Sequence, residues 1–289
     1  CAGPRLARMK HLQIAAPSRL AYFGSLVAED AGFALLEAAI CVAQDDTPGL
    51  DPQAVLGEID RLAGELKARL PADTPPLRRL RALNQYFFVE LGFAGNLNNY
   101  YDRRNSHIHE VLATRRGIPI TLALIYIEIA GQLGLKAHGV SFPGHFLVKL
   151  RMPQGEVVID PMSGQSLSRS ELEERLLPYR RSRGLTGEFE VPLGLFLQAA
   201  TPRDVIARLL RNLKEIHRTA EDWSRLLAVC ERLVVLLPQA WDERRDRGLV
   251  RAELGQDEGA AQDLQAYLQH QPDADDAGAL RERLRSLAD

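Results

Sequence analysis

Two side chains with complementary chemistry, His145 and Asp160, lie at the same end of a predicted β-hairpin. The segments FPGHFLVKLRM and GEVVIDPMSG flank a Pro153-Gln154-Gly155 turn, which is a hairpin signal. His145 begins the first strand and Asp160 ends the second, so both are expected near the open end. A carboxylate beside an imidazole fixes its tautomer and stabilises its charged form. This pair is the orienting half of a nucleophile–base–acid triad.

The third member of such a triad belongs at the start of a nearby helix. Unsatisfied N–H groups and the helix dipole at that position lower a thiol pKa and hold a developing oxyanion. The apolar segment that follows Gly117-Ile118-Pro119 is the expected helix, but proline carries no nucleophile. Thr121 is the nearest hydroxyl, and it would need an adjacent base. Simple packing or a hydrogen bond near the helix start is the alternative role of Thr121.

His145 also has a purely structural interpretation, in which it is a buried histidine that bonds to Asp160 and holds the hairpin end. His107 and His109 could join this pair as metal ligands. A His-x-His spacing in a short helix points the two rings apart, however, so we expect no metal site and no cofactor.

The elements that must position these residues are a long core helix and an antiparallel sheet. Strands are expected at Lys136–Phe142, Phe146–Met152 and Glu156–Asp160, which makes the fold class α+β. Residues 18–76 have helical periodicity and form a predicted N-terminal lobe, and residues 77–200 form the predicted core.

The segment FAGNLNNYYDRRNSH precedes the core helix and is rich in asparagine and tyrosine. Side chains of this kind compete for backbone hydrogen bonds, so it should be an ordered loop that either lines a site or is only structural. The candidate binding residues in this loop and in the neighbouring motifs are Asn96, Asn99, Tyr101, Asp102, Asn105, Arg116, Pro119 and Phe142.

Residues 201–289 are predicted to form helical repeats. Pro238 and Pro272 are thirty-four positions apart, which is the tetratricopeptide period. Two helix pairs are too few to stand alone, so they should dock on the core or on a partner. An arginine-rich stretch before the repeats, which includes Arg175, is predicted to be a solvated helix and linker, with an acidic-partner patch as the alternative.

Composition excludes several classes of partner. The formal net charge is −2, so no general field attracts nucleic acid or an anionic membrane. The longest apolar run, Ile118–Ala130, is shorter than the roughly 20 residues that span a bilayer. Three widely separated cysteines predict a reducing compartment, and the N-terminus has no secretory signal pattern. We therefore expect a cytoplasmic protein.

The blocks RRGIPI and FPGHFLV, followed by VVIDPMSG, resemble the bacterial SirB-type invasion-regulator family. This resemblance covers the chain from about Ser18 and implies a papain-like, transglutaminase-like core followed by tetratricopeptide repeats. It assigns His145 and Asp160 to the superfamily's Cys-His-Asp triad and leaves Pro119 at or near the cysteine position. The resulting expectation is a non-catalytic protein that binds protein or peptide partners. The alternative is a hydrolase or acyltransferase on peptide amides with a displaced nucleophile such as Thr121.

Overall fold

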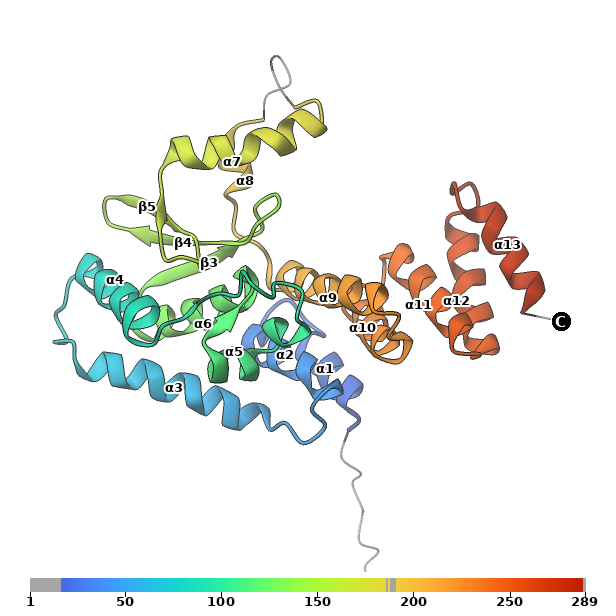
Figure 1. The fold of residues 1–289 in the computed structure, drawn as a ribbon, viewed down its shortest axis with the longest axis horizontal. Helices are drawn as coiled ribbons and strands as arrows, with labels where there is room; N and C mark the ends of the chain where they lie inside the picture. The colour runs from blue at the N-terminus through green and yellow to red at the C-terminus, as the bar shows by residue number, and fades with distance from the viewer. Residues whose placement is uncertain (1–16, 186, 188–190, 288–289) are drawn as a thin grey trace, which may run out of the picture.

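The computed structural model describes residues 17–185, 187 and 191–287. Figure 1 shows an elongated molecule in which helices surround a small sheet at one end and stacked helices project at the other. The expectation about a secretory signal concerns residues that lie outside this described part. No helix in the described ranges is long and apolar enough to cross a membrane.

The N-terminal helices pack beneath the core helix. They are α1 (Arg19–Leu26), α2 (Leu35–Val42), the short η1 (Ala43–Asp45) and α3 (Pro52–Ala68). Asp51 caps α3 through the Gln53 N–H, and Pro52 occupies the first turn, where its missing N–H costs no hydrogen bond. Helix α4 (Pro76–Asn84) continues into the π-helical η2 (Gln85–Glu90), so this helical segment widens in its second half.

Helix α6 (Pro119–Gln132) is mostly apolar and lies inside the end of the molecule that contains the sheet (Figure 1). A helix of this kind needs cover on every face. Helix α3 packs on one side of it, and strands β3 (Lys136–Val140) and β4 (Leu147–Met152) pack on another.

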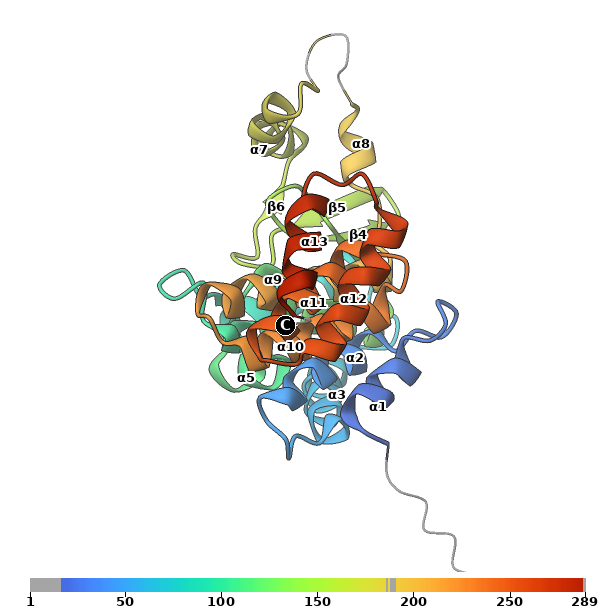
Figure 2. The ribbon, with the colours of Figure 1, turned by 90° about the vertical axis from the view of Figure 1, so that its right-hand side faces the viewer.

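The sheet is antiparallel in the order β3-β4-β5-β6, where β5 is Gly155–Ile159 and β6 is Ser166–Leu167. Side chains alternate across it: Val148 and Leu150 join the core around α6, whereas Leu147 faces the opposite layer. That opposite layer is made by α7 (Arg169–Ser182) and α8 (Leu193–Phe196), which rise together above the sheet in Figure 2. The predicted α+β arrangement is confirmed.

Four further short elements precede α6. Strands β1 (Ala94–Gly95) and β2 (Arg116–Gly117) pair in parallel. Between them lie the 3-10 turn η3 (Arg103–Ser106) and α5 (Ile108–Thr114).

The C-terminal helices form the predicted repeats. They are α9 (Pro202–Thr219), α10 (Trp223–Leu236), α11 (Trp241–Glu253), α12 (Asp257–His270) and α13 (Ala277–Ser286). Helices α10 and α12 both end two residues before the prolines that set the thirty-four-residue period. Helices α11, α12 and α13 stack outward along the right of Figure 1.

One hydrophobic core joins the first repeat to the rest of the chain. It runs from Phe23 of α1 through α6 to Leu236 of α10. Helix α9 packs against both α2 and α10, so this repeat docks on the core as expected. The boundaries at residues 76 and 200 stay predictions, because no break in this core marks either of them.

Candidate functional site

His145 and Asp160 lie side by side at the open end of the β4–β5 hairpin. The β4–β5 register pairs Val148 with Ile159, which brings the residues just before β4 beside those just after β5. His145 stands in the turn before β4, where its backbone N–H donates to the Phe142 carbonyl oxygen at 3.0 Å. Its Nε2 is 2.9 Å from Asp160 Oδ1. The other ring nitrogen, Nδ1, has no hydrogen-bond partner among the described residues.

Asp160 is the most constrained residue of this site. Its carboxylate is buried and accepts three hydrogen bonds: from His145, from the Met162 backbone N–H at 3.0 Å and from Arg175 Nη1 at 2.9 Å. Burial opposes ionisation, but the His145 and Arg175 hydrogen bonds outweigh it and lower the Asp160 pKa to about 2. Asp160 is therefore a carboxylate at neutral pH, and it holds the imidazole in one orientation.

Two short strands link the Asp160 turn to the start of α6. The Met162 carbonyl oxygen accepts from the Gly95 N–H at 3.0 Å, and Gly95 pairs with Gly117 between β1 and β2. A Cβ at 95 would lie 2.2 Å from the Met162 methyl carbon, so a larger residue there would force the Met162 side chain to move. Residue 119, two positions after Gly117, opens α6. The β1–β2 pair thus holds the helix start near the histidine–aspartate pair.

The first turn of α6 offers no free nucleophile. Pro119 is the first helical residue and is buried, and Ile118 before it makes no side-chain cap. The fully buried Thr121 hydroxyl lies 2.7 Å from the Asn105 carbonyl oxygen and 3.0 Å from that of Ile118. A hydroxyl has one proton to donate, and both neighbours are acceptors. The Thr121 hydroxyl is therefore engaged by the backbone.

The asparagine-rich loop is ordered by its own side chains. Asn96 Nδ2 donates to Asn105 Oδ1 at 3.0 Å, and Asn105 Nδ2 donates to the Asn99 carbonyl oxygen at 2.6 Å. Asn99 donates in turn to Asp102 at 3.2 Å, and the other Asp102 oxygen caps η3 through the Arg104 N–H. These bonds place the Asn105 carbonyl oxygen beside Thr121, so the loop supports the helix start.

The remaining candidate binding residues do not converge on His145. Tyr101 is 77% exposed at the tip of the loop. Arg116 donates to the Gly92 carbonyl oxygen at 2.6 Å, away from the hairpin. Phe142 is buried in the layer between the sheet and α7, and only its carbonyl oxygen contacts the His145 turn.

The expectation that His107 and His109 point apart is wrong. Their rings lie nearly parallel, at an interplanar angle of 14° and a centroid distance of 5.9 Å. His107 is the N-cap of α5 with an extended backbone, so helical spacing does not apply to this pair. His107 faces Asp46, its Nε2 lying 3.6 Å from Oδ2, and burial lowers its pKa to about 4. No cluster of three potential metal ligands occurs in the described ranges.

Comparison with known sequences identifies both halves of the molecule. A sequence model of the transglutaminase-like superfamily matches residues 53–211, and a tetratricopeptide-repeat model matches residues 213–285. The chain belongs to the transglutaminase-like superfamily. The transglutaminase-like core and helical repeats predicted from the sequence are thereby confirmed.

Several curated proteins are similar to this chain over most of their length. A UPF0162 protein of Xylella fastidiosa (strain Temecula1) is 35% identical over 90% of this chain and 92% of its own. A UPF0162 protein of Pseudomonas aeruginosa is 30% identical over 88% and 91% of the two chains. The UPF0162 protein YchA of Escherichia coli K12 is 27% identical over 82% and 86%. These names state no activity and no partner.

Sequence reasoning missed the cation of this transglutaminase-like site. Arg175 was grouped with a solvated arginine-rich helix, yet it closes the network around Asp160. The sequence does carry a signal for the start of α7, because Ser168 and Glu171 form a capping box there. This signal does not indicate the partner of Arg175, which depends on how the helix packs on the sheet.

Proposed function

We propose that this transglutaminase-like protein is a non-catalytic binder of protein or peptide partners. A transglutaminase-like domain joined to tetratricopeptide repeats fits a protein-interaction role. In the proposal, the cleft beside His145 and the surface of the repeats both contribute to binding. A cytoplasmic location belongs to the same proposal; Cys41 and Cys230 are both buried and unpaired.

The observation that carries the proposal is the composition of the first turn of α6. Acyl transfer in this scaffold needs a thiolate or alkoxide beside the imidazole. The turn offers Pro119 without a nucleophile and Thr121 with its hydroxyl held by backbone carbonyl groups. Burial raises the pKa of Cys41 to about 11 and that of Cys230 to about 12, so neither thiol ionises readily at neutral pH.

A second function, peptide-amide hydrolysis or acyl transfer, has one observation in its favour. The His145–Asp160 bond leaves Nδ1 free of any partner in the described part of the chain. A general base needs such a free nitrogen within reach of a nucleophile. Under this alternative, a displaced group such as the Thr121 hydroxyl would rotate toward His145.

A turnover assay separates the two functions. Purified full-length protein is incubated with a mixture of fluorogenic peptide amides and, separately, with thiol- and hydroxyl-directed covalent probes. A binder shows neither turnover nor labelling at 121. Turnover that disappears in both Thr121→Ala and His145→Ala, and that survives in Thr121→Ser, would make the enzyme the correct assignment.

A reactivity test asks whether the scaffold could still support a nucleophile. In Pro119→Cys, made together with Cys1→Ser, we expect iodoacetamide to react with a thiol whose pKa is below the usual value of about 8.5. Adding His145→Ala should raise that pKa if the imidazole faces residue 119. An unreactive Cys at 119, with the fold intact by circular dichroism, would show that the helix start is not aligned with the histidine.

A further inference from the structure

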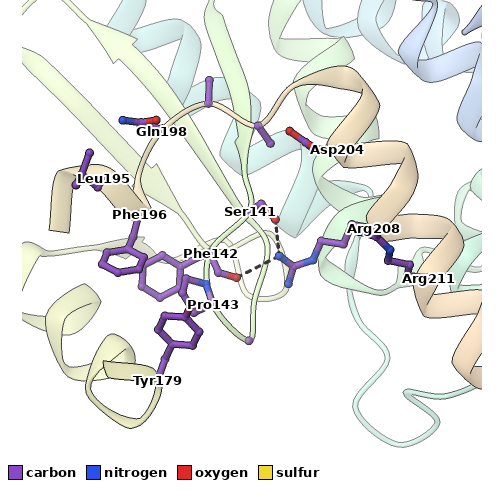
Figure 3. Close-up of a pocket in the computed structure, with 13 residues that line it drawn as sticks. Ser141, Phe142, Pro143, Tyr179, Leu195, Phe196, Gln198, Asp204, Arg208 and Arg211 are labelled. Carbon is purple, nitrogen blue, oxygen red and sulfur yellow. Dashed lines mark hydrogen bonds between the residues drawn. The ribbon is translucent and has the colours of Figure 1, made fainter. Parts of the chain in front are cut away.

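A pocket lies beside the turn that carries His145. It has a volume of about 610 Å³, within the range of ligand sites. Its walls come from the β3–β4 turn, the end of α7, the segment around α8 and the start of α9, as Figure 3 shows. The residues that matter here are Ser141, Phe142, Tyr179, Phe196, Asp204 and Arg208.

Arg208 of α9 is the distinctive group of this pocket. Its Nη1 donates to Ser141 Oγ at 2.7 Å and to the Phe142 carbonyl oxygen at 3.2 Å. The guanidinium also lies over the Phe146 ring, 5.7 Å from its centroid. Within the described residues it makes no ion pair, and its Nη2 and Nε make no hydrogen bond. Burial lowers the Arg208 pKa, as expected for a partly desolvated cation without a counter-ion.

The other charged groups of the pocket are already engaged. Arg211 pairs with Glu243 at 2.8 Å. Asp204, one turn before Arg208, accepts a hydrogen bond from the Thr201 hydroxyl at 2.6 Å and lies at the helix start. Arg208 is thus the one cation of the lining that has no carboxylate partner in the described ranges. The N–H groups of Nε and Nη2 form one edge of the guanidinium, and this edge matches a carboxylate, which can accept two parallel hydrogen bonds.

An aromatic wall completes the pocket. Tyr179 and Phe196 meet edge to face, with ring centroids 5.9 Å apart. In Figure 3 their rings gather with that of Phe142 on one side of the 141–144 segment, while Arg208 reaches this segment from the other side. Leu195, 55% exposed, adds apolar surface at the rim. The pocket therefore offers a cation at one end and apolar surface at the other.

The size of the pocket favours a peptide over a single small acid. Its volume of about 610 Å³ lies in the range of sites that enclose drug-sized ligands, which are comparable in size to two or three residues. The end of a peptide chain can place its α-carboxylate at Arg208 and an apolar side chain against Tyr179 and Phe196.

We propose that this pocket binds the C-terminal carboxylate of a peptide or protein through Arg208, with an apolar side chain of the last residues against Tyr179 and Phe196. This assignment rests on the proposed binding function and specifies the class of partner. The carboxylate would supply the counter-ion that Arg208 lacks, and the aromatic wall would select apolar termini.

The test uses fluorescence anisotropy with full-length protein and N-terminally labelled hexapeptides of sequence Gly-Ser-Gly-Ser-Leu-Phe. One probe ends in a free carboxylate and its match ends in a neutral amide. We expect the acid to bind at least tenfold more tightly, since one charge-assisted interaction is equivalent to about that factor. N-acetylphenylalanine, which has the carboxylate without the chain, should compete only weakly.

Matched variants assign the effect to one side chain. Arg208→Gln should lower acid affinity about tenfold and remove the difference between acid and amide, and Arg208→Lys should restore part of it. Arg211→Gln is the control, because Arg211 is already paired with Glu243, and it should leave the acid-to-amide ratio unchanged. Replacing the last two residues of the probe by Ser-Lys should weaken binding.

The outcomes separate this assignment from the general function. Equal affinity for acid and amide, or an unchanged ratio in Arg208→Gln, overturns the carboxylate pocket while leaving a peptide binder. No binding of either peptide at about 1 mM also overturns it. If N-acetylphenylalanine competed as strongly as the acid peptide itself, the ligand of the pocket would be a small acid and not a peptide terminus. If turnover of amides were found and the acid preference persisted, the non-catalytic function would fail and the pocket would stand.

Discussion

The turn between β3 and β4 separates two charged regions that differ in how their charges are neutralised. On one side, Asp160 is surrounded by His145, Arg175 and the Met162 N–H, so the carboxylate has a complete set of donors. On the other side, Arg208 lies in an open pocket, where the partners that the described residues give it are a hydroxyl, a carbonyl group and a ring. The first region neutralises its charge within the fold, and the second leaves room for an external group.

This difference suggests how to distinguish structural charge from binding charge. A buried charge is tolerated when the folded chain supplies its partner, and removal of that partner is then costly. A charge that faces a cavity without a partner gains its counter-ion only when a ligand arrives. The Asp160 region should therefore govern stability, and the Arg208 region should govern affinity.

The largest expected effect is on stability, from Asp160→Asn. The asparagine side chain would place an N–H group opposite a donor that now bonds to a carboxylate oxygen of Asp160. Loss of a buried, paired charge costs about 3–5 kcal/mol, and the partial exposure of Arg175 places this site near the lower value. We expect the free energy of unfolding to fall by about 3 kcal/mol, measured by urea denaturation.

The control for this prediction is Glu173→Gln, which removes the exposed pair between Arg169 and Glu173. It should change stability by less than about 0.5 kcal/mol. If Asp160→Asn cost no more than this surface variant, the Asp160 network would not be a stabilising element, and the comparison between the two regions would fail.

The second prediction is that the loss of stability caused by Asp160→Asn depends on pH. The folded-state pKa of Asp160, about 2, lies below the usual aspartate value of 3.8, so the unfolded chain binds this proton more readily. Its contribution is fully present above about pH 4 and is lost as pH falls toward 2. The difference in unfolding free energy between wild type and Asp160→Asn should shrink as the pH falls from about 5 toward 2. Urea titrations at several pH values measure it, and a difference independent of pH down to 3 would contradict the assignment.

Thr121→Val gives the third prediction and tests the closed region at the helix start. Valine has nearly the same shape but leaves the buried Asn105 carbonyl oxygen without its best donor. We expect a loss of about 1–2 kcal/mol in unfolding free energy, and Thr121→Ser should recover most of it. A Thr121→Val protein as stable as wild type would mean that the hydroxyl is free for another role, as the enzyme alternative requires.

Periodicity and turn chemistry were sufficient to predict most of the scaffold. The apolar run gave α6, the Pro153-Gln154-Gly155 turn gave the β4–β5 hairpin, and the spacing of two prolines gave the register of the repeats. These features depend on residues close in sequence. The strand ends were less accurate: β3 stops at Val140, because a turn from Phe142 to His145, with Gly144 at φ +70°, leads into β4.

The charged parts of both regions could not be predicted in the same way. Arg175 and Arg208 lie on α7 and α9, which each carry further arginines, and neither spacing nor charge pattern distinguishes these two or indicates their partners. Arg208 contacts the β3–β4 turn from a helix that lies more than sixty positions later in the sequence. No sequence pattern links this helix to the turn. Contacts of this kind follow from how the first repeat docks on the core. His145 and Asp160 were easier to relate, because hairpin pairing brings them together.

The smallest expected effect is that of Arg208→Gln on the stability of the unliganded protein, and it is the sharpest comparison with Asp160. Arg208 gives up hydrogen bonds to Ser141 and Phe142 and contact with Phe146, but its removal also relieves the desolvation of an unpaired cation. These terms oppose each other, so we expect a change within about 1 kcal/mol by urea denaturation, although the acid-peptide affinity drops. A destabilisation as large as that of Asp160→Asn would place Arg208 among the structural charges. The pocket would then be part of the scaffold, and the distinction between the two sides of the turn would disappear.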